Sequence, residues 1–293
     1  IILVYHSVGG KGIFEDNIIR TDIFEKQMKH LLKKRTIVSL NSIIDKKLKN
    51  EPIPENWAVI TFDDGYKDFA VNAEPLLQKH NIPATIFICS STFEANAELF
   101  FDKLQRVISS THKKTINMEF PGQNYQYKIK TEKQKRDAIL KLALIFRELS
   151  TEHMAKYLDQ LCTLCNIPIS PENNNNYLTE DDIEQLDHLT SIGSHTVSHA
   201  NLASLSEKEL MNELVKSKNR LQSIVGDKQI IDLFSYPFGK PWSYNDNVKD
   251  AVQRSKYRCA VTTTPKTVNQ SSNIYELPRV GAGNCMSRFK LNL

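Results

Sequence analysis

Short apolar runs alternate with amphipathic segments over the first ninety residues, and the alternation resumes at residue 179. The runs at 57–62 (WAVITF) and 84–90 (ATIFICS) are almost continuously apolar, as expected for parallel strands that are covered on both faces. Helical periodicity separates such runs at 22–34, 40–48 and 72–80. This regular alternation predicts a parallel α/β architecture.

The segment 22–34 carries the clearest amphipathic pattern of the first half. Asp22, the first residue of this segment, is the expected N-cap, because a short polar side chain can accept from the first free backbone N–H groups. Its predicted apolar stripe comprises Phe24, Met28, Leu31 and Leu32.

The last third of the chain repeats the strand and helix pattern. Capping sequences at Thr179–Asp182 and Ser206–Glu209 predict two helices, the second of which ends before Gly226. Strands are predicted at 189–195, at 230–239, in RCAVTTT and in YELPRV. The total is about eight strands. No glycine-rich dinucleotide turn follows any of them, so a barrel is favoured over an open sheet.

The pattern breaks between residues 93 and 178. A helix is expected near 98–110, a hairpin at Pro121–Gly122, and a long helical region near 131–165. The polar run PENNNNY then favours turns over packing. We interpret 93–178 as an insertion within a single domain that spans residues 1–293.

Composition and charge exclude some functions. A net charge of +4 over 293 residues does not indicate a nucleic-acid partner, although a basic face could favour peripheral contact with an anionic membrane. No apolar run approaches the ~18 residues of a membrane span. The five cysteines suggest no disulfide framework, and Cys162 and Cys165 fit the buried face of a helix better than a zinc site.

These features favour reduced thiols and a location in the cytoplasm or at the inner face of the membrane. A periplasmic or secreted location is the alternative, because the sequence starts at Ile1 rather than Met and an upstream signal or anchor is conceivable. The oligomeric state is not indicated by the sequence.

Polar groups that could bind a cation follow two of the predicted strands. Asp63 and Asp64 come directly after WAVITF, and a pair of adjacent buried carboxylates is costly without a positive partner. His195 and His199 follow a later strand at a spacing that metal ligands often have. In parallel α/β barrels the carboxyl ends of the strands meet at one mouth. Asp64, His195 and His199 would there leave coordination positions open for water and substrate.

His6 ends the first apolar run and is followed by Gly9 and Gly10. A histidine in such a place is more often structural than functional, so this position alone decides nothing.

Three motifs together resemble one family. TFDDGY, SHTVSH and SYPFG, in this order, are similar to the polysaccharide deacetylase (NodB-homology) family, carbohydrate esterase family 4, and to its branch with an N-terminal YHSV and a C-terminal LPRV. The resemblance covers residues 1–92 and 179–290. It implies a distorted (β/α) barrel with one divalent ion, most often Zn²⁺, with Co²⁺, Ni²⁺ or Mn²⁺ as alternatives. It also implies removal of acetyl groups from an N-acetylated sugar, in a cell-surface polysaccharide or a lipid-linked glycan precursor.

The resemblance also implies individual roles. Asp63 matches the family's general base, and Asp64, His195 and His199 match its metal ligands. The backbone N–H of Phe238 would stabilise the oxyanion. Two departures concern the remaining roles.

The family's third motif often has an arginine where this chain has Ser235, and Arg279 of LPRV is the expected substitute that orients Asp63. The usual C-terminal leucine–histidine motif is absent, and no histidine follows His199. His6 is therefore the expected general acid.

Two aromatic residues are weaker candidates. Tyr66 and Trp242 could contact the sugar, or each could simply pack against the fold. Two other functions stay open at this stage: the same fold acting on a cyclic imide or ureide, and a glycan-binding module without activity. The latter would be expected to lack an intact metal triad.

Overall fold

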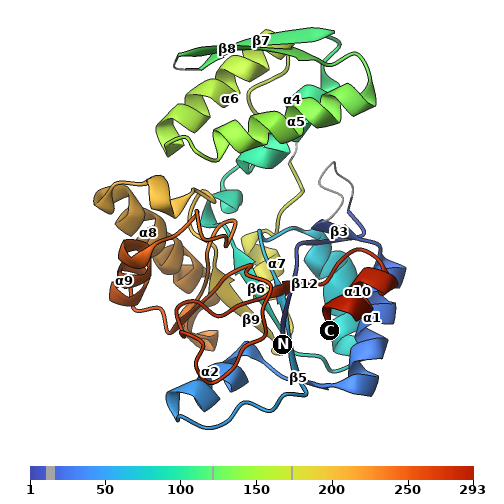
Figure 1. The fold of residues 1–293 in the computed structure, drawn as a ribbon, viewed down its shortest axis with the longest axis vertical. Coiled ribbons are helices and arrows are strands. Elements are labelled where there is room, and N and C mark those ends of the chain that lie inside the picture. Colours follow the sequence, from blue (N-terminus) through green and yellow to red (C-terminus); the bar gives the residue numbers. More distant parts are fainter. Residues whose placement is uncertain (11–16, 121, 173) are drawn as a thin grey trace. The chain divides into compact units, whose positions relative to one another are not determined.

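The computed structural model describes residues 1–10, 17–120, 122–172 and 174–293. They form two compact units: residues 1–93 with 175–293, and residues 94–174 (Figure 1). The second unit covers most of the stretch that we interpreted as an insertion at 93–178, and that interpretation stays a prediction. Among the described residues, no helix has both the length and the apolar character needed to cross a membrane.

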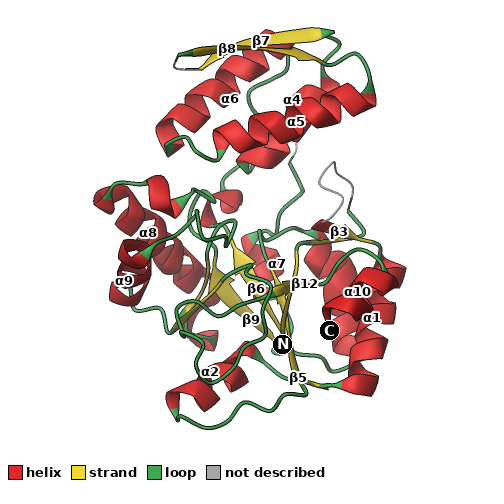
Figure 2. Ribbon diagram, in the orientation of Figure 1, coloured by secondary structure: helices red, strands yellow, loops and turns green. Residues whose placement is uncertain are grey.

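The first unit is built on an eight-stranded parallel sheet with helices around it (Figure 2). Its strands follow the order β11 (Cys259–Val261), β10 (Leu233–Ser235), β9 (Thr190–Ser194), β6 (Ala84–Ile88), β5 (Trp57–Phe62), β1 (Ile2–Tyr5) and β12 (Val280–Gly281), and β4 (Thr36–Ile37) also pairs with β5. All these pairs are parallel. The predicted class, with seven to eight parallel strands, is confirmed.

The sheet curls until its two edges share one segment of chain. Leu277 forms a parallel bridge with Val261 of β11, and three residues later Val280 pairs with Leu3 of β1. The segment that contains LPRV therefore contacts both ends of the strand order. This curling gives a half-barrel, where the resemblance implied a distorted (β/α) barrel. It also places Arg279 in the interior that the curled sheet encloses.

Alternate residues of each strand face opposite sides of the sheet. Ile60 and Phe62 pack outward with Phe24 of α1 (Thr21–Lys34) and Phe289 of α10 (Met286–Asn292). Val59 belongs to the opposite face. That inner face continues with Ile2, Phe87, Leu233 and Leu277, and α2 (Leu40–Leu48) packs against it.

Because side chains alternate along the strand, Thr61 and Asp63 lie on the same inner side as Val59. The Phe87 side chain fills this interior and packs against Gly193 of β9. A Cβ on Gly193 would lie only 2.5 Å from the Phe87 ring, so this position requires glycine.

Two details of α1 differ from the sequence prediction. The helix starts at Thr21, one residue earlier than predicted, and Arg20 occupies the N-cap position without a side-chain cap. Asp22 is not the N-cap: it lies in the first turn and pairs with Arg20 and Lys26, where a carboxylate is also favoured by the helix dipole. Leu32 was wrongly assigned to the apolar stripe, since it is 45% exposed.

Capping sequences located the later helices correctly. Thr179 and Asp182 form a capping box at α7 (Glu180–Glu184), and Ser206 and Glu209 form another at α8 (Glu207–Val225). Gly226 follows the end of α8 as predicted. The predicted strand at 230–239 is reduced to β10, because the backbone turns at Pro237 with Phe238 and Gly239 at positive φ.

The other elements of this unit are short. They are β2 (Ser7–Val8), β3 (Ile18–Ile19), the π-helix η2 (Phe69–Ala73), α3 (Glu74–Lys79), the 3₁₀ helices η3 (Ser90–Phe93), η4 (Leu202–Ser204) and η5 (Gly226–Lys228), and α9 (Asp246–Arg254).

The second unit contains three helices and a hairpin. They are α4 (Phe100–Ser110), β7 (Thr115–Phe120), β8 (Gln123–Lys128), α5 (Glu132–Phe146) and α6 (Thr151–Cys165). The hairpin is confirmed as antiparallel, and Pro121 at its turn lies outside the described residues. The predicted single helical region at 131–165 is two helices, because Ser150 caps a new one. Cys162 and Cys165 are buried on α6, as expected.

Candidate active site

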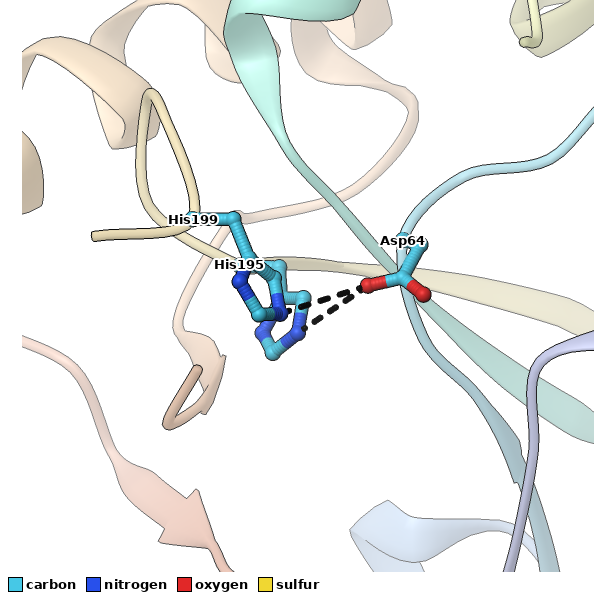
Figure 3. Close-up of side chains that lie close together, drawn as sticks. All are labelled: Asp64, His195 and His199. Atoms are coloured by element: carbon cyan, nitrogen blue, oxygen red, sulfur yellow. Dashed lines mark ion pairs between the residues drawn. The ribbon is translucent and has the colours of Figure 1, made fainter. Parts of the chain in front are cut away.

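One carboxylate and two imidazoles converge at the carboxyl ends of β5 and β9. Asp64 Oδ1 lies 3.5 Å from Nε2 of His195 and 3.5 Å from Nε2 of His199 (Figure 3). All three side chains are buried. The structure thus brings together the three residues that the sequence analysis selected as metal ligands.

The backbone around these residues adopts conformations that L-residues rarely occupy. Asp64 has φ of 75° and Gly65 has φ of 82°. A Cβ on Gly65 would lie 2.8 Å from Ile88, so the DDG turn requires glycine there. Thr196 and His199 also have positive φ, at 70° and 58°. Such strained positions cluster where the surrounding structure holds functional side chains in place.

The donor set fits a divalent transition metal. Asp64 Oδ1 is buried and accepts no hydrogen bond among the described residues, although it faces both imidazoles. His195 Nδ1 lies 2.7 Å from the carbonyl oxygen of Ser235, so this nitrogen is the donor and Nε2 keeps its lone pair for a ligand. Two imidazoles and a carboxylate are a common catalytic zinc set. Within the described ranges, no other group of three or more potential ligands was found.

Burial and charge have opposite effects on the two histidines. Burial lowers the pKa of His195, but Asp63 and Asp64 outweigh it and the net pKa is raised. For His199, burial and the neighbouring His195 lower the pKa to about 4. Burial raises the pKa of Asp64, but the adjacent histidines, chiefly His195, outweigh it and the net pKa is lowered. The carboxylate is therefore ionised and can serve as a ligand.

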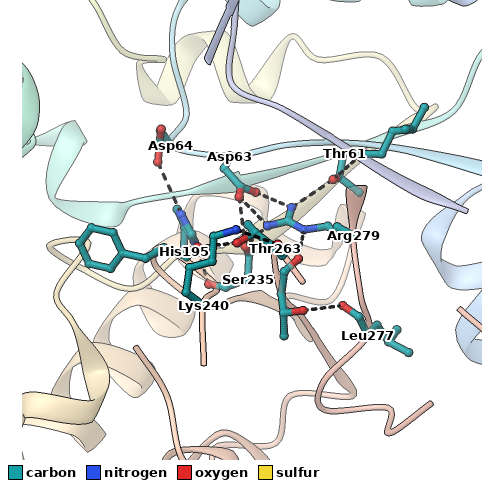
Figure 4. Close-up of polar contacts among 12 residues, drawn as sticks. Thr61, Asp63, Asp64, His195, Ser235, Lys240, Thr263, Leu277 and Arg279 are labelled. Atoms are coloured by element: carbon teal, nitrogen blue, oxygen red, sulfur yellow. Dashed lines mark hydrogen bonds and ion pairs between the residues drawn. The ribbon is translucent and has the colours of Figure 1, made fainter. Parts of the chain in front are cut away.

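Asp63 is held by a buried arginine. Arg279 donates from its two terminal nitrogens to Asp63 Oδ1 and Oδ2, at 2.7 and 2.6 Å (Figure 4). It also donates to the Thr262 carbonyl, the Thr61 hydroxyl and the Ser235 hydroxyl. Arg279 is fully buried, and its fork fixes the carboxylate by two parallel bonds.

The contact predicted between Arg279 and Asp63 is therefore present. Burial alone would raise the pKa of Asp63. The charge of Arg279, that of His195 and the Arg279 hydrogen bonds overcome it and hold this pKa well below its usual range. Ser235 stands where the resemblance led us to expect an arginine, and it takes part through both its hydroxyl and its carbonyl. The sequence analysis did not assign Ser235 a role of its own.

His6 belongs to the same mouth. It follows β1 and is half-buried, and its charge contributes to lowering the pKa of both Asp63 and Asp64. It also lines a pocket together with Gly281.

The next residues form a defined turn. The hydroxyl of Ser7 donates to Asp68 at 2.5 Å. Asp68 is half-buried in this contact. Gly9 has φ of 81°, consistent with the predicted turn of the chain after His6.

Aromatic side chains extend from the candidate metal ligands toward the surface. The Phe238 ring lies 4.8 Å from the His199 ring and 5.1 Å from Trp242, centroid to centroid. Trp242 is 39% exposed. Phe238 has φ of 62°, in the turn after β10. Tyr66 stacks on Tyr177 and is paired with it through the backbone.

Comparisons with solved structures place this fold among deacetylases. The chain is similar to the Streptococcus pyogenes deacetylase PplD in complex with acetate, with a TM-score of 0.64 and 19% identity, over 99% of this chain and 95% of that one. It is also similar to a de-N-acetylase from Aggregatibacter actinomycetemcomitans, with a TM-score of 0.58 and 18% identity, over 100% and 98% of the two chains. The chain thus shares the fold of these two proteins.

Sequence comparison gives the family. The family model described as polysaccharide deacetylase matches residues 50–144 and 170–260. The chain belongs to the polysaccharide deacetylase family, as the resemblance indicated. The putative polysaccharide deacetylase YxkH of Bacillus subtilis (strain 168) is 30% identical over 112 residues, which is 38% of this chain and 38% of the length of that relative.

The matched ranges contain the DDG turn, both ligand histidines and the SYPFG turn. His6 and Arg279 lie outside them. Their assignment therefore depends on the geometry described above.

Proposed function

We propose that this chain is a metal-dependent hydrolase that removes the acetyl group from an N-acetylated sugar of a cell-surface polysaccharide or a lipid-linked glycan precursor. One observation carries the proposal: a buried Asp–His–His triad lies beside a carboxylate that a buried arginine keeps ionised. Family membership supplies the deacetylation chemistry.

The triad would hold the ion. Asp64 Oδ1 and the two Nε2 atoms face one another, and the hydrogen bond from His195 Nδ1 to Ser235 fixes the orientation of that imidazole. Zn²⁺ is the best match to this donor set, with Co²⁺, Ni²⁺ or Mn²⁺ as alternatives. A divalent ion bound there would polarise the acetyl carbonyl and make a water molecule more acidic.

Asp63 is the general base. Because Arg279 keeps it ionised, it can accept a proton from the attacking water at neutral pH. Arg279 also aims the carboxylate, since a two-point contact leaves it little freedom to rotate. Arg279 thereby takes over the role that an arginine at position 235 would have.

Charge then develops on the acetyl oxygen as the tetrahedral intermediate forms. The backbone N–H of Phe238 is the proposed donor to this oxygen, and the Phe238 ring lies 4.8 Å from that of His199, centroid to centroid. His6 is the proposed general acid that protonates the departing amine, because an amide anion is too basic to leave unaided. Trp242 and Tyr66 are the proposed contacts for the sugar.

The intact triad favours deacetylation of a sugar over the two alternatives. A glycan-binding module without activity would not need an ionised base held by a buried arginine beside three potential ligands. An amidase that acts on a cyclic imide or ureide shares the fold, and relatives of that kind often lack part of the set found here.

The test is mass spectrometry of a panel of N-acetylated glycans incubated with the protein. The panel should contain a polymer, a lipid-linked and a nucleotide-linked sugar, with a cyclic imide as the competing substrate. We expect at least one glycan to exchange an acetyl group for hydrogen with release of acetate. Asp63→Asn serves as the control that retains the metal ligands and loses most activity. Turnover of the imide alone would contradict the proposal.

A further inference from the structure

Glu213 is a buried carboxylate that the site described so far does not use. It lies on α8 and is 9% exposed. Among the described residues, no lysine, arginine or histidine forms an ion pair with it. Its side chain accepts three hydrogen bonds, all from one short loop, so its role is tied to that loop.

The loop is the one that connects the two ligand histidines. Glu213 Oε2 accepts from the backbone N–H of Val197 at 2.8 Å and from that of Ser198 at 2.9 Å. Glu213 Oε1 accepts from the Ser198 hydroxyl at 2.8 Å. The carboxylate therefore binds both residues at the middle of the H-x-x-x-H segment.

The opposite side of the loop is held by a different element. The carbonyl oxygens of Thr196 and Val197 accept from the N–H groups of Ser90 and Ser91 at the start of η3, both at 3.0 Å. Donors of the loop thus point to α8 and acceptors point to η3. The loop is clamped between two elements that contact each other.

This clamp acts on a strained segment. Thr196 and His199 both have positive φ, and within the loop the His199 N–H donates to the Thr196 hydroxyl at 3.0 Å. Residues in such conformations persist only where their surroundings over-determine them. Without Glu213, two partly buried backbone N–H groups would lose their acceptors, and the loop would be expected to relax.

α8 reaches this region at a second point, one helical turn further on. Ser217 lies 2.8 Å, oxygen to oxygen, from Ser194 of β9, the residue before His195. Glu213 and Ser217 thus form a polar ridge on a helix whose neighbouring positions, Leu214 and Leu221, are apolar and buried.

From this geometry we infer that Glu213 is a positioning residue for the metal centre: by accepting from Val197 and Ser198 it sets the separation and orientation of His195 and His199. The inference rests on the proposed metal site. Glu213 contacts neither a ligand side chain nor the substrate position. Its effect on metal affinity is transmitted by the loop backbone.

The test compares substitutions at Glu213 that separate geometry from charge. Glu213→Gln keeps an oxygen for the two N–H groups, and its amide can donate to the Ser198 hydroxyl. Glu213→Asp keeps the charge, but its side chain is shorter by one methylene, so its carboxylate oxygens lie farther from the donors of the loop. Glu213→Ala removes all three bonds. Leu214→Ala is the matched control, because it weakens the packing of the same helix without touching the loop.

The first readout is the dissociation constant for Zn²⁺ alone, measured by competition with a chelator, together with the visible spectrum of the Co²⁺-loaded protein. We expect Glu213→Ala and Glu213→Asp to weaken Zn²⁺ binding about 10- to 100-fold and to alter the Co²⁺ spectrum. Glu213→Gln should restore most of the affinity, and Leu214→Ala should bind as the wild type does. Retained affinity in the Asp variant with loss in the Gln variant would mean that charge acts, and it would overturn the inference.

The second readout is hydrogen exchange of the Val197 and Ser198 amides in metal-free protein. It should rise in the Glu213→Asp and Glu213→Ala variants and stay low in Leu214→Ala. Unchanged exchange would overturn the inference even where the alanine variant folds poorly, because the Asp and Gln variants give the same comparison. If the wild type bound no Zn²⁺, the proposed function would fail, while the exchange data would still decide whether Glu213 holds the loop.

Discussion

Replacing Arg279 with methionine tests the buried pair on which the chemistry of Asp63 depends. The substitution keeps most of the side-chain volume and removes the charge. The two partners are 0% and 3% exposed and joined by bonds of 2.7 and 2.6 Å. The Ser235 hydroxyl, 3.4 Å from Asp63, would remain as a weak partner. Leaving one member of a buried pair uncompensated costs about 3–5 kcal/mol. We expect the free energy of unfolding at neutral pH to fall by about this amount.

The loss should depend on pH in a defined direction. In the wild type the folded-state pKa of Asp63 is depressed. The pair therefore stabilises the fold above the unfolded pKa of about 3.9, and this contribution is lost only as the pH falls through the lower folded pKa. In the variant, burial is opposed only by the nearby histidines, chiefly His195, so we expect the pKa of Asp63 to rise above that of the unfolded chain. Its folded state then takes up a proton more readily than the unfolded chain as the pH falls, so the difference between the two proteins should shrink.

The assay is denaturant unfolding of metal-free protein between about pH 7.5 and about pH 4.5. The matched control is Arg254→Met, which removes an exposed pair with Glu207 whose partners are 57% and 59% exposed. That change should cost less than about 1 kcal/mol. If Arg279→Met lowered the free energy of unfolding by no more than Arg254→Met does, or by an amount that did not vary with pH, the reasoning would be refuted. In the metal-loaded enzyme the acidic limb of kcat/KM should also move to higher pH.

Other substitutions test the remaining assignments. His6→Ala should keep the metal and lose about 10²–10⁴-fold in rate on amides, with a much smaller loss on an activated acetyl ester, and equal losses would contradict its role as the acid. Trp242→Ala should raise KM for a glycan and leave kcat unchanged if the ring stacks on the sugar, and an unchanged KM would contradict stacking. Replacing residues 94–174 by a short linker should leave the affinity for Zn²⁺ intact. It should change the preference between polymer and small substrates if this segment shapes access of the glycan to the site, and an unchanged preference would contradict that role.

Strand ends were the informative part of the sequence. Parallel strands align their carboxyl ends, so Asp64 and His195 could be placed at one mouth although 131 positions separate their numbers. The curling of the sheet was also predictable, from the number of strands and the missing dinucleotide turn. The Arg279–Asp63 contact was predicted from the family resemblance, whose third motif often has an arginine where this chain has Ser235.

Long-range backbone contacts could not be predicted in the same way. Ser235 orients His195 through its carbonyl oxygen, which every residue type has, so the identity of residue 235 gave no signal of that contact. Glu213 left a weak signal: it lies three residues after Leu210, beside Leu214, on the side of the helix that packs against the sheet. A charged residue at such a position needs a partner, but periodicity does not indicate which one.

Helix ends show the same limit on a smaller scale. Asp22 was a reasonable N-cap by residue type. The helix instead begins at Thr21, and the side chain of Arg20 at the N-cap position forms no capping hydrogen bond. Ser150 does cap α6, but the helical periodicity on both sides of it is strong enough to hide the break.

The central claim is that one divalent ion held by Asp64, His195 and His199 enables deacetylation. The most direct measurement titrates Zn²⁺ into chelator-treated protein while acetate release from an N-acetylated glycan is recorded. We expect release to be negligible at first and to rise to a plateau at one equivalent of metal per chain, with no rise for His199→Ala. Acetate release that is the same before and after metal addition, or an unchanged titration for His199→Ala, would contradict the account.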